Sequence, residues 1–179
     1  MTATDLWQVL EASWPAATQC PFGPFMWRDG AGGGSRVSAA TTINQPDSGA
    51  LDTIEQRFSS VGRDALFQLR DGDETFDALL AERGYDIVDP TLCLAASVDS
   101  FAEFDPKLGY TSWPPIAAQK DIWQAGGINA ARLEVMNRVK ISKTTVLARD
   151  GEAPAGTAFI AALGSIAVLH ALEISTEHR

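Results

Sequence analysis

The stretch Thr157-Ala-Phe-Ile-Ala-Ala-Leu-Gly-Ser-Ile-Ala-Val-Leu-His-Ala-Leu-Glu-Ile174 decides the fold of the C-terminal part of the chain. Its 18 residues are almost all apolar, which approaches the minimum length of a membrane-spanning helix. Gly164-Ser165 interrupts the run in the middle, and the ionisable His170 and Glu173 follow, which would be costly to bury in a bilayer. The pattern therefore predicts no membrane span but two buried strands joined by a tight turn.

The residues before this stretch predict an antiparallel meander behind two helices. A helix is expected over 116–124 and a second from Asn129, followed by a strand over 144–149 and a hairpin turn at Asp150-Gly151. A last strand as apolar as 166–174 is normally covered on both faces, and nothing after it supplies a cover. We therefore expect a fold that is incomplete at its C-terminus. The free edge of the last strand should be covered by a second copy, giving a homodimer, or by a segment of the N-terminal half.

The first half of the chain predicts a smaller mixed unit. Helices are expected over 5–13, 49–61 and 74–83. Strands are expected over 22–28, 35–42, 65–70 and 85–97, the first two forming a hairpin with a glycine-rich tip. This tip does not indicate a phosphate loop, because Ser35 stands where G-x-G-x-x-G needs its last glycine. We expect an N-terminal half over 1–97, a linker over 98–112 and a second half over 113–179.

Composition narrows the classes of function. The 179 residues carry 14 Lys and Arg against 23 Asp and Glu, a net charge of −9, which argues against nucleic acid and favours cationic partners. Two cysteines, Cys20 and Cys93, are too few for a disulfide scaffold or a cysteine-based zinc site and suit a reducing cytoplasm. The N-terminus has no signal-peptide pattern. Asp71–Glu74 does not meet the spacing of a calcium loop, so no metal site is expected.

The end of the chain reads Leu172-x-Ile174-x-Thr176-x-x-Arg179. It resembles the entry to the cofactor site of the GNAT superfamily of acyl-CoA-dependent N-acetyltransferases, whose fourth strand reads roughly L-x-V-x-P-x-x-R. Leu172, Ile174 and Arg179 match this pattern, and Thr176 stands in place of the proline. The segment 65–97, with Arg83-Gly84-Tyr85 at a family-like turn, resembles the distal half of such a domain. The resemblance implies an α/β fold of the α+β type, a GNAT-like, mainly antiparallel sheet flanked by helices, with a degenerate copy ahead of the catalytic half.

The resemblance also implies a reaction and its residues. Acetyl-CoA would donate an acetyl group to a small-molecule or peptide amine. Leu172, Glu173 and Ile174 would pair with the acetyl-pantetheine arm, and Arg179 would open the pyrophosphate motif, whose other five residues the chain lacks. We therefore expect a truncated form that is weakly active or inactive.

Two candidates for the general base remain open. The ordinary pKa of histidine suits His170 to the task, and period-2 counting places it on one strand face with Leu172 and Ile174. Glu173 is the alternative, on the other face unless a bulge intervenes. The competing function is a non-catalytic binding or interaction module on a GNAT-like scaffold, and the sequence does not specify the acceptor.

Overall fold

The computed structural model describes residues 3–101, 103 and 105–179, grouped in two compact units. We call Ala16–Phe101 the N-terminal unit, and Met1–Pro15 together with Ala102–Arg179 the C-terminal unit. The sequence-based division assigned the first 15 residues to the N-terminal half. In the structure they group with the C-terminal sheet, because the apolar side of their helix packs on it.

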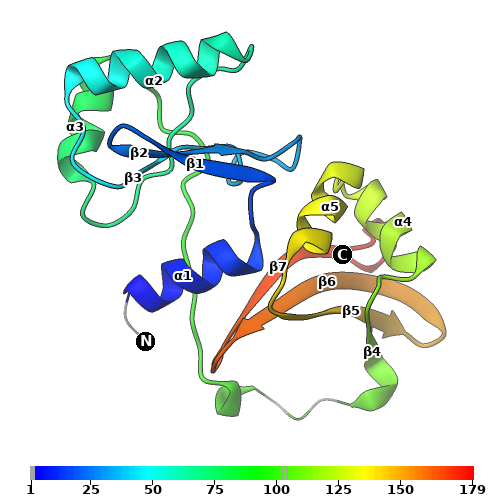
Figure 1. Cartoon of the computed structure of the whole chain (residues 1–179). Coiled ribbons are helices and arrows are strands. Elements are labelled where there is room, and N and C mark those ends of the chain that lie inside the picture. The colour runs from blue at the N-terminus through cyan, green and yellow to red at the C-terminus, as the bar shows by residue number, and fades with distance from the viewer. Residues whose placement is uncertain (1–2, 102, 104) are drawn as a thin grey trace. The chain divides into compact units, whose positions relative to one another are not determined.

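The C-terminal unit is built on a four-stranded antiparallel sheet (Figure 1). Its strands follow the chain in the order β4 (Gly109–Ser112), β5 (Ser142–Asp150), β6 (Ala153–Leu163) and β7 (Ile166–Ile174). The expected turns are confirmed, with Gly151 and Gly164 at φ +55° and +59°, where glycine is the least strained residue. β7 is an outer strand, and no described residue pairs with its outer edge. Coverage of that edge by a second copy or another segment stays a prediction.

Three helices cover one face of this sheet. They are α1 (Ala3–Ser13), α4 (Ala117–Ala125) and α5 (Ala130–Arg138), which confirm the helices expected there. Apolar side chains from α4, from α5 and from the residues next to them meet those of β6 in one buried cluster: Trp123, Ile128, Met136, Val139, Phe159 and Ala161. None of the helices among the described residues is long and apolar enough to cross a membrane.

A buried polar network joins α4 to three strands. The Gln119 side chain is fully buried, and its Oε1 accepts hydrogen bonds from the Ile116 amide (3.0 Å) and from the hydroxyls of Ser112 and Thr145 (3.1 Å each). Its Nε2 donates to Thr157 Oγ1 (3.2 Å). Because the bond to the Ile116 amide is half of a capping box, one side chain both starts the helix and fixes its place on the sheet.

The N-terminal unit pairs two helices with a small sheet. Its elements are β1 (Thr18–Phe22), β2 (Phe25–Asp29), β3 (Thr41–Thr42), α2 (Ser48–Ser60) and α3 (Glu74–Glu82). The two helices confirm the expected ones. The core of this unit consists of buried apolar residues: Phe25, Trp27, Ala40, Leu51, Ile54, Phe58, Phe76 and Leu80.

The strand predictions in this unit were largely wrong. β2 pairs with β1 across Gly23. On its other side it pairs with β3, so only Thr41-Thr42 of the strand expected over 35–42 forms the antiparallel pair that the sequence predicted. The amides of Ser38 and Ala39 donate to the carbonyl of Ser35, so this segment turns where a hairpin partner was expected. β1 escaped detection because its side chains are mostly exposed and lack an apolar face.

The two later strands expected in this unit are also absent. Segment 65–70 makes a single parallel bridge, between Phe67 and Ala40. Segment 85–97 is irregular and bends at Asp89, whose φ is +56°. A strand exists only where a second backbone completes its hydrogen bonds, and no described backbone pairs with 85–97. The remaining short 3₁₀ turns are η1 (Val98–Ser100), η2 (Pro106–Leu108) and η3 (Thr176–His178).

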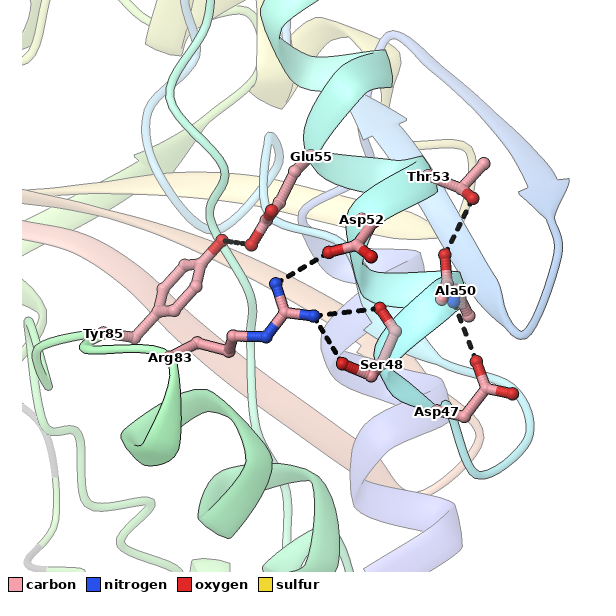
Figure 2. A network of polar contacts seen from close by, with 9 residues as sticks. Asp47, Ser48, Ala50, Asp52, Thr53, Glu55, Arg83 and Tyr85 are labelled. Atoms are coloured by element: carbon pink, nitrogen blue, oxygen red, sulfur yellow. Dashed lines mark hydrogen bonds and ion pairs between the residues drawn. The ribbon is translucent and has the colours of Figure 1, made fainter.

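A polar network ties the end of α3 to α2 (Figure 2). Arg83 donates to the Asp52 carboxylate (2.7 Å) and to the Ser48 carbonyl (3.2 Å), and the Tyr85 hydroxyl donates to Glu55 Oε1 (2.7 Å). Burial, together with the neighbouring Glu55 carboxylate, raises the pKa of Tyr85 well above its ordinary value. The network holds the residues that follow α3 against α2 and so fixes the direction in which the chain continues.

We expect Gln119→Met to lower the free energy of unfolding by about 2–4 kcal/mol, because it leaves several buried partners unsatisfied while nearly preserving volume. The same substitution at the exposed Gln124, on the same helix, should change it by less than about 0.5 kcal/mol. Urea titrations of both variants check this. Equal effects would show that the buried network contributes nothing specific.

We expect the protein to lose stability above about pH 10, where the unfolded Tyr85 phenol ionises while the folded one stays protonated. The sign follows from the raised pKa in the folded state, since unfolding then releases a proton and is favoured by alkali. Tyr85→Phe should flatten this loss, and the exposed Tyr110→Phe should not. Unfolding titrations across this pH range, with phenolate absorbance, provide the measurement.

Candidate functional site

A β-bulge in β7 is the main irregularity of the C-terminal sheet. Thr157 of β6 pairs with Glu173, and Phe159 pairs with His170, so two residues of β7 stand opposite one of β6. The extra residue interrupts the alternation of side chains along β7.

The bulge reverses part of the predicted side-chain pattern. Directly paired residues share a sheet face, so His170 and Glu173 both lie on the face of Phe159 and Thr157, which the helices cover. Ile174 pairs with Gly156 and lies on the opposite face. The expectation that His170 shares a face with Ile174 was therefore wrong, because simple alternation does not allow for an inserted residue.

Trp123 holds the bulge in place. Ala171 has φ +50°, in the left-handed region that costs an alanine about 1–2 kcal/mol. The fully buried indole of Trp123 donates from Nε1 to the Ala171 carbonyl at 2.7 Å. This bond fixes the direction of one peptide unit, while the following residue, Leu172, has no partner in the ladder and is 60% exposed.

His170 is enclosed by the core. It is 7% exposed, its Nε2 lies 2.8 Å from Ser13 Oγ, and its ring lies 5.1 Å from that of Trp14 and 6.3 Å from that of Phe159. The contacts around it come from the end of α1 and from β6. This environment is that of a hydrogen-bonded core histidine, and its role as a base stays a prediction.

Glu173 lies nearer to solvent, against the end of α4. Its side chain is 13% exposed and forms an ion pair with Arg179, which is 58% exposed. The carboxylate lies so close to Gly126 that a Cβ there would collide with it. The C-terminal end of a helix carries partial negative charge, so the Arg179 guanidinium offsets an unfavourable position for Glu173.

Arg179 also contacts the backbone of the candidate site. Its Nε donates to the Ile174 carbonyl at 3.0 Å. Four of the expected site residues, Leu172, Glu173, Ile174 and Arg179, are therefore brought together at the end of β7, whereas His170 is buried on the other side of the bulge. No group of described residues has the composition of a metal site.

Sequence reasoning missed two residues of this site. Trp123 falls inside the helix expected over 116–124, and Gly126 lies just beyond its end. The signal that was available is the pair Gly126-Gly127, because a glycine that ends a helix can also admit a side chain from another strand. Nothing in the sequence indicated that the Trp123 indole would donate a hydrogen bond to a carbonyl 48 residues away.

The comparison with solved structures returns a "GCN5-related N-acetyltransferase from Kribbella flavida". The superposition has a TM-score of 0.68 at 18% sequence identity and covers 99% of this chain and 74% of that one. No protein-family model and no curated protein matches the sequence. The likeness confirms the expected fold: the chain has a GNAT-like α/β architecture with antiparallel sheets and flanking helices.

We expect Trp123→Phe to destabilise the protein by about 1–3 kcal/mol, because the buried Ala171 carbonyl loses its donor. Amide exchange at 171–173 should accelerate more than exchange elsewhere in β6 and β7. Ala171→Gly is the matched control: it removes the left-handed strain and should leave stability unchanged or raise it by up to about 1 kcal/mol. Unaltered exchange in Trp123→Phe would show that the bulge persists without the indole.

Proposed function

We propose that the C-terminal unit carries the site of an acyl-CoA-dependent N-acetyltransferase, which moves an acetyl group from acetyl-CoA to an amine. The observation that carries the proposal is the bulge at Ala171 and Leu172, held by Trp123 within a GNAT-like fold. At this point β7 offers backbone groups that the neighbouring strand does not use.

The residues at the end of β7 suit the acetyl-pantetheine arm of the substrate. An arm that contains amides needs backbone donors and acceptors in a row. Leu172 has no partner in the ladder, and the Ile174 carbonyl accepts a hydrogen bond from the exposed Arg179 side chain. The backbone of Glu173, between these two residues, completes the row of groups that would pair with the arm. We assign the guanidinium of Arg179 to the pyrophosphate of the same substrate, as a charged donor.

The reaction needs a base. An amine with a pKa near 10.4 is deprotonated in only about one molecule in 2,500 at pH 7. Of the two candidates we favour Glu173, because its ion-pair partner is exposed and can exchange it for the substrate, whereas His170 is enclosed by Ser13 and Trp14. When the amine attacks the thioester carbon, negative charge develops on the acetyl carbonyl oxygen, and a backbone N–H at the bulge would stabilise it.

The charge of the protein favours a cationic acceptor. With a net charge of −9, the surface attracts small-molecule or peptide amines and repels nucleic acid. Cys20 and Cys93 are free and exposed, which agrees with a site that works in a reducing cytoplasm.

A second candidate is a non-catalytic binding module on the same scaffold. The observation in its favour is that Arg179 engages both the Glu173 carboxylate and the Ile174 carbonyl, two groups that the transferase would need. In such a module this closed arrangement would be the working state.

We expect weak binding of acetyl-CoA, with a Kd of about 0.1 mM or weaker, because the substrate and the protein are both anionic.

Glu173→Gln should lower thiol release from acetyl-CoA in the presence of primary amines by about 10²–10⁴-fold, with the Kd nearly unchanged. His170→Ala should instead lower stability by about 1–3 kcal/mol and preserve the rate per folded molecule.

Calorimetry, an amine panel and melting curves on the same preparations supply these measurements. Binding of acetyl-CoA without amine-dependent thiol release would favour the non-catalytic module. No binding at millimolar concentrations would overturn both functions. A large rate loss in folded His170→Ala, with Glu173→Gln unimpaired, would move the role of base to His170.

A further inference from the structure

Segment Thr91–Ser97, which we call the apolar segment, has the sequence pattern of a strand without being one. Leu92, Leu94 and Ala96 alternate with Thr91, Cys93, Ala95 and Ser97, and no residue of the segment is charged. In an extended conformation the leucines would share one face and the smaller residues the other.

The structure leaves this segment exposed. All residues from 86 to 101 are exposed, with Leu92 at 88% and Leu94 at 93%. Among the described residues, no backbone hydrogen bond joins 86–96 to any other backbone group. These N–H and C=O groups therefore have no backbone partner among the described residues, and two large apolar side chains are exposed beside them.

Such a combination is characteristic of a strand that pairs with another molecule. Unpaired backbone groups beside apolar side chains are the feature that proteins normally hide with lysine, proline or a bulge. The N-terminal unit has no lysine at all, and the only proline nearby, Pro90, precedes the segment. Addition of a strand here would satisfy the backbone and bury the leucines together.

Charge identifies the partner. Asp86 and Asp89 precede the segment and Asp99 follows it, while no cation lies between 86 and 101 in the sequence. An antiparallel pair of two identical copies centred on Leu94 would place Asp89 opposite Asp99, so like charges would oppose self-pairing. The acidic residues at both ends of the segment therefore favour a partner whose own ends are basic.

We propose that Thr91–Ser97 is a docking site for an extended, apolar protein segment flanked by lysine or arginine, which binds by β-strand addition. This inference concerns the N-terminal unit and does not depend on the proposed transferase site.

Synthetic peptides test the proposal directly. One peptide has an alternating valine-threonine core with two lysines at each end, a second has glutamates in place of the lysines, and a third has prolines at alternate core positions. Hydrogen exchange of the whole chain should show protection of amides 91–97 by the lysine peptide. The glutamate peptide should bind at least about tenfold more weakly, and added salt should reduce the difference. The proline peptide should not bind, because it lacks the donors of the ladder.

Substitutions in the segment provide the matching test from the protein side. Cys93→Pro removes a backbone donor, and Leu92→Asn with Leu94→Asn removes the apolar face. Both should reduce binding of the lysine peptide at least about tenfold without a change in melting temperature, because these side chains are exposed. Leu108→Asn, at an exposed leucine outside the segment, should bind as the parent protein does.

Three outcomes would overturn the proposal. One is the absence of protection with any peptide at millimolar concentration. Another is unchanged binding in Cys93→Pro. The third is self-association that protects 91–97 in the absence of peptide, which would make a second copy the occupant.

Discussion

The hydrogen bond from the Trp123 indole to the Ala171 carbonyl is the contact on which the candidate site depends. It stabilises a left-handed alanine, the alanine allows β7 to bulge, and the bulge places Glu173 on the face of Thr157. The Gln119 network, one helical turn earlier, holds the same helix on the same sheet. α4 therefore acts as the fixed element against which the end of β7 is positioned.

Electrostatics sets the character of the site at the end of β7. Glu173 lies beside Gly126, at the negative end of α4, and its side chain is mostly buried, a position that is stabilised because Arg179 pairs with it. The same guanidinium bonds the Ile174 carbonyl. One exposed arginine thus contacts both a carboxylate and a backbone acceptor. The two proposed functions differ on this point: in a transferase the substrate would displace the Arg179 side chain, and in a binding module the side chain would stay in place.

The fold was predictable where a pattern is local. The helices over 49–61 and 74–83, the hairpin turns at Gly151 and Gly164, and the three C-terminal strands follow from periodicity and turn chemistry, and the structure confirms them. Strands in the N-terminal unit were mistaken because pairing is not local: 85–97 has a strand composition but no described partner, and β1 has a partner but little apolar pattern. The face of Glu173 was left open for the same kind of reason, since one inserted residue changes every position after it.

The sequence by itself determined the net charge of −9 and indicated the fold class, through an apolar run interrupted at Gly164-Ser165 and a helix–helix–strand–strand–strand order that resembles a GNAT domain. Only the tertiary structure decided which of the candidate site residues lie next to one another. His170 and Glu173 are three positions apart, yet one is enclosed by α1 and the other lies at the end of α4. The physical reason is that alternation and propensity act over a few residues, whereas a carbonyl finds its donor, and a carboxylate its cation, through contacts between segments far apart in the chain.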